Sequence, residues 1–592
     1  MSLRDSDLRI RPGRIRNTRA PKAKSFINKV LRAAQRAGHV AGAGSARKVG
    51  GRLGHSTFGR GRTAFGRSRL FAPTRRVVVK ARIIRHKGRA FRSAPVSAHL
   101  SYLKREGVSR EGGKGVMFDA STDRADDLAF AERCRDDRHH FRFIVSPEDA
   151  AEMSDLKAFT RDLARQMEAD LGTRLDWVAA DHWNTDNPHV HLIVRGVDDA
   201  GADLVIARDY VSRGLRSRAE DLVALELGPK PEHEIRNALK KEISAERWTR
   251  LDTEIQRAAD EVGYIDLRPG STGLADPELR RLMIGRLQHV EKMGLAVQSS
   301  SGEWLVGLEA ERTLRDLGDR GDIIKTMHRA FAERGGERAE RGVTDYVIDD
   351  VGTGSRIVGR LVDRGLHDEL TGEAYAVIDG TDGRAHHIRF HGVKAFEQAP
   401  PDGGIVEVRR FGGPDDRRPV LVLALRSDLD LAAQVTAPGA TWLDHRLVER
   451  EAMPLASAGF GQEVREAMLA RAEHLAGEGL AQRDGGRLVL QRNLLSTLRR
   501  RELDAVGNQL SVETGLPHVK AEAGGSIAGT LRQRLSLSSG RFAVIDDGLG
   551  FQLVPWSREL DRKLGQHVAG VAGEGGGIEW SLGRKHDLGL GL

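Results

Sequence analysis

The stretch DHWNTDNPHVHLIVRG, residues 181–196, decides the fold of the N-terminal half of the chain. A polar loop and a proline precede the apolar run HVHLIVRG (189–196), so the stretch predicts a hairpin in which this run pairs with the strand RLDWVAADH (174–182). Two earlier runs, RRVVVKARIIR (75–85) and FRFIVS (141–146), are rich in β-branched or aromatic residues and also predict strands. Together the four runs indicate an antiparallel sheet.

Residues 147–171 predict a helix that covers this sheet. Its apolar side chains recur every three or four positions and so share one helical face: Met153, Leu156, Phe159, Leu163, Met167 and Leu171. Ser146, Pro147 and Asp149 predict a capped start for the helix. Residues 75–245 are therefore expected to form one α+β domain, an antiparallel sheet with flanking helices.

Three histidines of the hairpin predict a metal site. His189 and His191 lie two apart in a strand and share a face, and the hairpin brings His182 opposite them. Three neutral imidazoles leave an open position on a divalent ion, as a Lewis-acid site requires. Asp181 and Asp186 are candidates to accept hydrogen bonds from the ligand histidines and so to orient them. The ion stays open between magnesium, manganese and zinc, because imidazoles favour the latter two while phosphoryl chemistry often uses magnesium.

Other histidine patterns and phosphate loops do not fit the sequence. A histidine-triad nucleotide hydrolase needs a third alternating histidine, but residue 193 is isoleucine. A zincin needs histidines four apart on a helix, whereas these lie on a predicted strand. The chain also has no GK[ST] motif, so the sequence offers no support for a nucleotide-driven motor.

A metal that polarises a phosphate still needs a nucleophile, and a tyrosine is one possibility, because its phosphate ester conserves the energy of the cut bond. The favoured candidate is Tyr102 in SAHLSYLKREGVSREGG, where Lys104, Arg105 and Arg110 could hold a phosphodiester near the phenol. Tyr210 is the reserve candidate. Only these two tyrosines fall within the histidine-bearing domain.

The C-terminal part of the chain contains a predicted duplication. Residues 278–317 parallel 463–503, in each case an amphipathic helix that ends at a glycine, then a two-strand ribbon and another helix, which is the order of a winged-helix module. Residues 355–380 likewise resemble 525–548, both glycine-punctuated and β-branched. The expected partners of the winged modules are DNA or another protein.

Composition and charge limit the class of protein. The 592 residues are too many for one domain. The N-terminal residues do not have the pattern of a secretory signal, and no apolar run is long enough to span a membrane. The single cysteine, Cys134, excludes an internal disulfide. Residues 1–92 hold 26 Lys and Arg against two acids, a net charge of +24, so the remaining 500 residues carry −14. A basic arm on an acidic body indicates binding to a polyanion, either nucleic acid or anionic lipid. A cytoplasmic protein is expected.

These patterns predict six segments. They are a basic arm (1–74) that is disordered until it meets its partner, an α+β catalytic domain (75–245), a winged-helix-like module (246–345), a β-rich module (346–450), a second winged-helix-like module (451–510), and a second β-rich module with the tail (511–592).

The motifs resemble those of a known family, the conjugative relaxases or mobilisation nucleases, which are endonucleases with a histidine-hydrophobe-histidine core. HLSYLKREGVSREG (99–112) is similar to the tyrosine motif of that family, FRFIVSPEDA (141–150) to its serine motif, and DHWNTDNPHVHLIVRG to its three-histidine motif. The resemblance extends to about residue 230. The remainder is similar to the C-terminal region that often accompanies the plasmid and integrative-element branch.

The resemblance implies a site- and strand-specific transesterase that nicks and rejoins DNA at a transfer origin. Tyr102 would become joined to the 5′ phosphate, His182, His189 and His191 would hold the divalent ion, and Ser146 would contact DNA near the nick. The implied partners are the single-stranded transfer-origin DNA, accessory relaxosome proteins and the coupling protein of a type IV secretion channel, through which the protein would travel with the strand.

Three alternatives remain open. A rolling-circle replication initiator or a single-strand transposase would share the chemistry. A non-enzymatic DNA-binding protein would hold a structural metal on the same histidines, and a phosphodiesterase would use bound water in place of a tyrosine.

Overall fold

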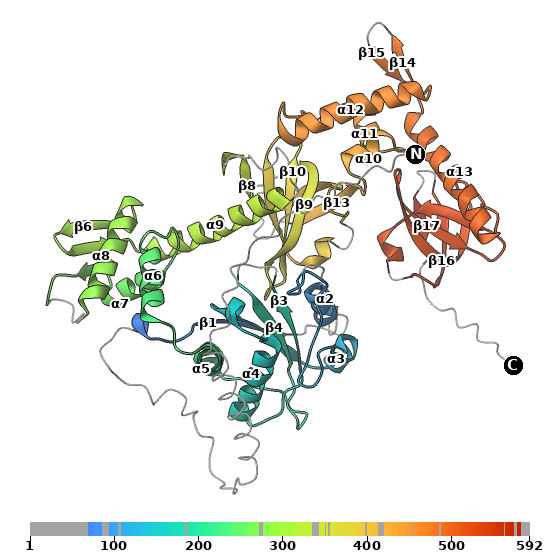
Figure 1. Cartoon of the computed structure of the whole chain (residues 1–592). Coiled ribbons are helices and arrows are strands. Elements are labelled where there is room, and N and C mark those ends of the chain that lie inside the picture. The colour runs from blue at the N-terminus through green and yellow to red at the C-terminus, as the bar shows by residue number, and fades with distance from the viewer. Residues whose placement is uncertain are drawn as a thin grey trace, which may run out of the picture. The chain divides into compact units, whose positions relative to one another are not determined.

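A computed structural model describes residues 69–85, 94–104, 108–183, 187–270, 276–333, 343–349, 351–352, 356–396, 399–412, 420–450, 453–484, 487–561, 563–573 and 577–581. The chain divides into two compact units, residues 1–318 and 319–592, and the boundary falls within α9 (Ala310–Glu333). Figure 1 shows the helices and strands of both units. The predicted basic arm lies outside the described residues as far as residue 68.

A four-stranded antiparallel sheet begins the first unit. Its strands, in the order β1-β2-β4-β3, are β1 (Val77–Arg85), β2 (His139–Pro147), β4 (His189–Arg195) and β3 (Trp177–His182). Each strand coincides with one of the four runs that predicted it. The predicted α+β class with antiparallel sheets and flanking helices is confirmed.

Helices cover the two faces of this sheet differently. On one face, α4 (Leu156–Leu171) and α5 (Leu215–Leu227) enclose a core that includes Phe143 and Leu192. On the other face, α2 (Ala94–Leu103) and α3 (Asp127–Arg133) pack on Val178 and Ile193 of β3 and β4. The histidines lie on this second face.

The predicted start of α4 is wrong. Ser146 and Pro147 still belong to β2, because they pair with Val78 and Val77 of β1, and the short turn η3 (Ala150–Glu152) follows. The N-cap is Asp155, whose carboxylate accepts hydrogen bonds from the amides of Lys157 and Ala158. Strand pairing therefore overrides the capping signal at Ser146.

A helical module completes the first unit. It consists of α6 (Glu232–Ile243), α7 (Arg250–Ala258), β5 (Tyr264–Asp266), α8 (Pro277–Lys292), β6 (Ala296–Ser300) and β7 (Glu303–Val306), with the strands in the order β5-β7-β6. Leu239 of α6 is buried in the core of this module, together with Leu251, Met283 and Trp304. The predicted boundary at 245/246 is therefore too late by one helix.

A second helical module lies in the second unit. It consists of α10 (Leu431–Val435), α11 (Trp442–Val448), α12 (Gly459–Gly477), β14 (Ala481–Asp484) and β15 (Arg487–Leu490). Leu431 and Leu443 pack with Val464 of α12, so this module also begins earlier than predicted, before residue 451. The assignment of the two helical modules as winged helices stays a prediction.

A buried arginine marks the two helical modules as copies. The fully buried Arg286 pairs through Nε and Nη2 with Asp252, the N3 residue of a capping box that begins at Thr249, at 2.8 and 2.9 Å. Arg471 pairs in the same way with Asp444, the N3 residue of the capping box at Thr441, at 2.9 Å for each bond.

The carbonyls that the two arginines contact also correspond. Apart from the carbonyl of Glu242, which only Arg286 contacts, they are those of Ile243, Ala245 and Arg247 in the first module and those of Val435, Ala437 and Gly439 in the second. These positions lie nine, seven and five residues before the respective aspartate. Equal spacing of three contacts is a strong sign of duplication.

Two β-sheet modules in the second unit also correspond. The first has the order β13-β12-β9-β10-β11, extended at one edge by β8 (Tyr346–Ile348), and the second has the order β20-β19-β16-β17-β18. Their strands are β9 (Arg356–Asp368), β10 (Glu373–Gly380), β11 (Ala385–Phe390), β12 (Ile405–Phe411) and β13 (Val420–Ser427) in the first, and β16 (Ser526–Leu537), β17 (Gly540–Asp546), β18 (Phe551–Pro555), β19 (His567–Ala572) and β20 (Ile578–Trp580) in the second. Position by position, the strands pair in the same order.

One long helix packs on each sheet. Met327 and Phe331 of α9 contact the first sheet at Val377, and Leu510 of α13 (Leu494–Thr514) contacts the second at Val544. Among the described residues, no helix combines the length and the apolar character that a membrane span requires.

Candidate metal centre

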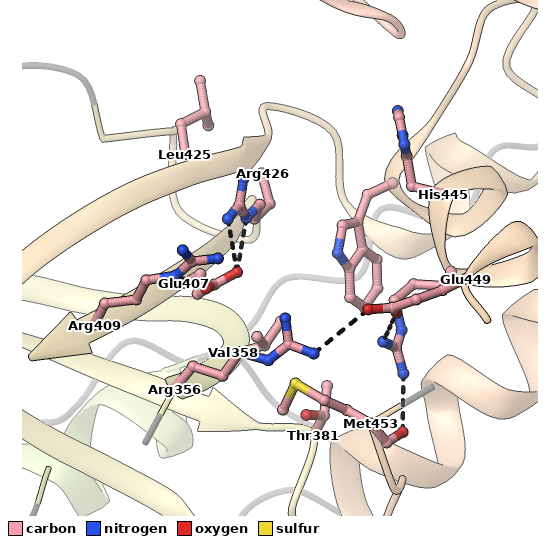
Figure 2. A pocket seen from close by; sticks show the side chains of 12 residues that line it. Arg356, Val358, Thr381, Glu407, Arg409, Leu425, Arg426, His445, Glu449 and Met453 are labelled. Carbon is pink, nitrogen blue, oxygen red and sulfur yellow. Dashed lines mark hydrogen bonds and ion pairs between the residues drawn. The ribbon is translucent and has the colours of Figure 1, made fainter. Parts of the chain in front are cut away.

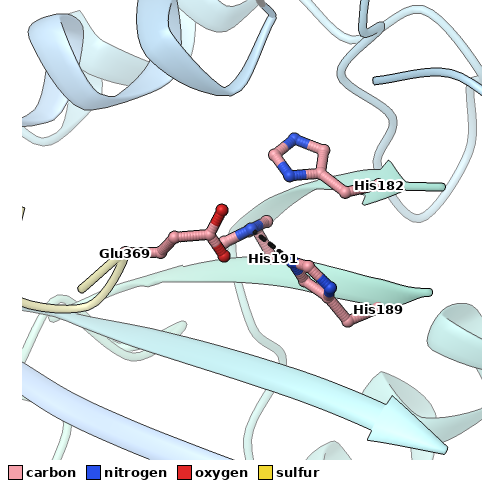
Figure 3. Close-up of side chains that lie close together, drawn as sticks. All are labelled: His182, His189, His191 and Glu369. Carbon is pink, nitrogen blue, oxygen red and sulfur yellow. Dashed lines mark hydrogen bonds between the residues drawn. The ribbon is translucent and has the colours of Figure 1, made fainter. Parts of the chain in front are cut away.

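The β3–β4 hairpin brings the three predicted histidines together. In its antiparallel register His182 lies opposite His189, and His191 lies opposite Ala180, so all three imidazoles share one face of the sheet (Figure 3). Each histidine offers a ring nitrogen, and these nitrogens lie within 4.8 Å of one another. Figure 3 also labels Glu369, which belongs to the second unit.

The spacing of the imidazoles fits shared coordination of one ion. The Nε2 atoms of His189 and His191 are 3.1 Å apart. Metal–nitrogen bonds of about 2.0–2.1 Å would place two ligand nitrogens about 2.9 Å apart at a right angle and about 3.3 Å apart at a tetrahedral angle. The ring of His182 is close to both, with its centroid 5.5 Å from that of His189 and 4.4 Å from that of His191.

Backbone carbonyls orient two of the rings. Nε2 of His182 lies 3.0 Å from the carbonyl oxygen of Leu103, and Nδ1 of His189 lies 3.0 Å from that of Asn187. Because a carbonyl only accepts, each of these nitrogens carries the proton, which leaves Nδ1 of His182 and Nε2 of His189 as the nitrogens with lone pairs. Outer hydrogen bonds of this kind fix a histidine in the tautomer that a metal requires.

The centre is enclosed. The exposed fractions of His182, His189 and His191 are 0%, 8% and 2%. Buried imidazoles that converge on one point suit a cation better than they suit an apolar core. A fourth imidazole, that of the buried His99 on α2, lies edge-on to His191 with 6.4 Å between centroids.

The helix that carries Tyr102 is joined to this centre. Tyr102 lies in the last turn of α2, and the next residue, Leu103, supplies the carbonyl that His182 contacts. The reserve candidate Tyr210 is instead buried in the core under α4 and α5, where its hydroxyl donates to Asp170 at 3.0 Å. Burial, together with the charge of Asp170, raises the pKa of Tyr210, so its phenol is a poor source of phenolate.

The predicted supporting acids lie apart from the ligand face or outside the described residues. Asp181 points to the opposite face of β3 by alternation, and its carboxylate accepts a hydrogen bond from Nε1 of Trp183 at 2.6 Å. It therefore positions the indole that begins the loop. Asp186 falls outside the described part of the chain.

The predicted DNA-contacting residues have the following surroundings. The hydroxyl of Ser146 donates to the carbonyl of Pro188 at 3.4 Å and so ties β2 to the loop before His189. Lys104 forms an ion pair with Asp127 at 2.7 Å. The guanidinium of Arg110 lies over the ring of Trp183, 4.6 Å from its centroid. Arg105 falls outside the described residues.

Three cations on the histidine face were missed by the sequence analysis. Lys80 and Arg82 of β1 are exposed, and the register places Lys80, Ile144 and His191 in one row across the sheet. Arg82 lies opposite the buried Arg142, whose pKa falls to about 10 because of burial and the charge of Arg82. The alternation of basic and apolar residues in β1 carried this signal, but only the register shows that the basic side shares the face of the histidines.

The first unit thus belongs to the class of α+β proteins with a buried three-histidine cluster that could hold a metal ion. A family sequence profile described as "Protein of unknown function (DUF3363)" matches residues 283–420 and 414–589, which together span more than half of the chain. The chain belongs to the DUF3363 family. No curated protein and no solved structure matches it. The matched residues begin within α8, after the histidine cluster.

Proposed function

We propose that the first unit is a metal-dependent relaxase, which nicks one DNA strand at a transfer origin and rejoins it through a covalent link to Tyr102. The observation that carries the proposal is the hydrogen bond of 3.0 Å between His182 and the carbonyl of Leu103. It joins the residue after Tyr102 directly to the histidine cluster, as a nucleophile acting beside a metal-bound phosphate requires.

The charge on the histidine face supports a polyanionic substrate. Lys80, Arg82 and Arg142 share this face with His191 across the register of β1, β2 and β4. Arg142 keeps its charge at neutral pH even though it is buried, because its pKa of about 10 remains well above 7. Such a row of cations attracts the phosphates of a single strand that runs across the sheet toward the centre.

The chemistry assigned to Tyr102 is a transesterification. The phenolic oxygen attacks phosphorus, the bond from phosphorus to the 3′ oxygen breaks, and the released 3′ oxygen takes up a proton while the phenol loses one. A divalent ion on His182, His189 and His191 would withdraw charge from the scissile phosphate. Tyr102 remains esterified to the 5′ phosphate, so the reverse reaction reseals the strand.

A denaturing gel tests the proposal. The full chain would be incubated with labelled single-stranded oligonucleotides that tile the DNA element encoding it, with and without chelator. We expect a protein-linked DNA band that requires a divalent ion, disappears in Tyr102→Phe and persists in the matched control Tyr264→Phe, whose ring is 37% exposed.

Three outcomes would overturn the proposal in different ways. Cleavage without an adduct would assign the attack to water, and binding without cleavage would favour a DNA-binding protein with a structural metal. An adduct that persists in Tyr102→Phe but disappears in Tyr210→Phe would move the nucleophile to the buried tyrosine.

The partners follow from this proposal. We propose single-stranded transfer-origin DNA as the substrate, and accessory relaxosome proteins and a type IV secretion coupling protein as further partners. A rolling-circle initiator or a single-strand transposase would give the same covalent band. Those alternatives are separated by whether the element that encodes the chain moves between cells when Tyr102 is intact.

A further inference from the structure

The second unit contains a pocket between its first β-sheet and helix α11. The pocket has a volume of about 390 Å³ and is lined by residues of β9, β12, β13 and α11 (Figure 2). This volume lies in the range of about 300–1,000 Å³ that is usual for small-molecule sites. All of its lining residues belong to the second unit, so the pocket is independent of the histidine centre.

One wall carries two arginines on a single carboxylate. Glu407 of β12 is 3% exposed and accepts hydrogen bonds from Arg426 of β13, at 2.9 Å from Nε, and from its strand neighbour Arg409. The two guanidinium groups hold the pKa of Glu407 low in spite of its burial, which acts in the opposite direction. This wall therefore carries one net positive charge.

The facing wall repeats the arrangement. Glu449, next to the C-terminal end of α11, pairs with Arg356 of β9 at 3.4 Å and with Arg446 of α11. Arg446 also donates through Nη2 to the carbonyl of Met453 at 3.0 Å. Its side chain is 91% buried, at 9% exposure, and yet its Nε has no hydrogen-bond partner among the described residues. A buried charged donor without a partner is costly, so it points to an acceptor supplied from outside.

The charges do not balance. Four guanidinium groups face two carboxylates, which leaves an excess of two positive charges around one cavity. Arg356 and Arg409 are direct cross-strand partners, and like charges in that position destabilise a sheet. A ligand with about two negative charges would neutralise the pocket, and a phosphomonoester carries about −1.5 to −2 at pH 7.

The duplicated sheet shows that the fold does not need these charges. In the second sheet, Ser526 and Val571 form the cross-strand pair that corresponds to Arg356 and Arg409. Ala569 stands in the position of Glu407. The same strand order is therefore built with uncharged residues at all three positions, so the charged set is a property of the pocket rather than of the sheet.

We propose that this pocket binds an organic phosphate through its phosphomonoester group, either a free nucleotide or the 5′-phosphorylated end of a strand. Arg356, Arg426 and the Nε group of Arg446 would contact the phosphate oxygens. The apolar part of the lining, which includes Val358, Leu425 and Met453, would contact the organic part of the ligand. The proposal does not rest on nicking by the first unit.

Isothermal titration calorimetry on the full chain tests the proposal, with adenosine 5′-monophosphate, adenosine, inorganic phosphate, and a short oligothymidylate with and without a 5′ phosphate as probes. We expect the monophosphate to bind and adenosine not to bind. Oligothymidylate that binds only when phosphorylated, and that competes with the monophosphate, would identify the strand end as a source of the group.

Variants of two pocket arginines distinguish a binding site from a structural ion network. Arg356→Gln and Arg426→Gln should each weaken binding about tenfold or more. Their side chains are 38% and 36% exposed, so the fold should tolerate both changes. The matched control Arg534→Gln, an exposed arginine of the second sheet, should leave the affinity unchanged.

Glu449→Gln is expected to raise the affinity for the monophosphate, whereas the arginine variants are expected to lower it. The glutamate substitution removes a competing carboxylate, so the monophosphate should bind more tightly, whereas a pocket with a purely structural role would show no gain. The proposal is overturned if neither the monophosphate, nor phosphate, nor the phosphorylated oligonucleotide binds at millimolar concentration. It is equally overturned if binding is the same in Arg356→Gln and in the Arg534→Gln control.

Discussion

Replacing Arg471 by methionine tests the physical basis of the duplicated helical modules. All five N–H groups of this arginine donate hydrogen bonds, two to Asp444 and one each to the carbonyls of Val435, Ala437 and Gly439. Both the arginine and the aspartate are fully buried. Methionine is unbranched and of similar volume but has no donor, so the substitution keeps much of the volume and removes the whole network.

The expected loss of stability follows from what remains buried. Breaking a buried ion pair costs about 3–5 kcal/mol, because the remaining carboxylate of Asp444 stays without a counter-charge. Each of the three carbonyls that lose a donor adds about 1 kcal/mol where water cannot replace it. We therefore expect Arg471→Met to lower the free energy of unfolding of the second unit by at least about 4 kcal/mol, a large part of the 5–15 kcal/mol of a typical domain.

Hydrogen–deuterium exchange measures this loss where it arises. Amides of α10, α11 and α12 should exchange faster in Arg471→Met, whereas those of α7 and α8 in the first unit should not change. Arg465→Met, an exposed arginine on the same helix, is the control and should cost less than about 1 kcal/mol. Adding Asp444→Asn to Arg471→Met should recover part of the loss, because it removes the unpaired charge. A loss below 1 kcal/mol, or no recovery in the double variant, would refute the reasoning.

Three further predictions concern the first unit. His191→Asn should weaken zinc binding at least about tenfold, measured by calorimetry, and should abolish the rise in unfolding temperature that zinc gives the unchanged chain. Lys80→Gln combined with Arg82→Gln should weaken binding of single-stranded DNA and reduce the slope of log affinity against log salt by about 1.4, whereas Arg138→Gln, an exposed control, should change neither. Burial, together with nearby carboxylates, raises the pKa of Cys134 to about 12, so iodoacetamide at pH 8 should label this thiol only after the chain is unfolded.

The elements of the first sheet could be predicted because their signals are local. Each strand is a short β-branched or aromatic run, and the spacing of His189 and His191 fixes their common face whatever the rest of the chain does. The placement of His182 required only that the loop close a hairpin, and the register of β3 and β4 confirms it.

The features that the sequence analysis missed depend on contacts between distant segments. Ser146 has the residue type of a helix cap, but the pairing of β2 with β1 keeps it in the strand. Lys80 and Arg82 come to the histidine face through a register that spans three strands. The role of Leu103 depends on its backbone carbonyl, and because every residue has one, the residue type does not predict this role.

The duplication offers a further way to separate function from fold. Residues that both copies retain, such as the buried arginine and aspartate of each helical module, are explained by packing and hydrogen bonding alone. Charges that only one copy carries, such as those of Arg356, Glu407 and Arg409, have no such explanation, because the other copy builds the same sheet without them. This pocket lies inside the region that defines the DUF3363 family, whereas the histidine centre lies outside it. Phosphate binding by the second unit and DNA nicking by the first should therefore be separable by mutation, with Arg356→Gln affecting only the former and His191→Asn only the latter.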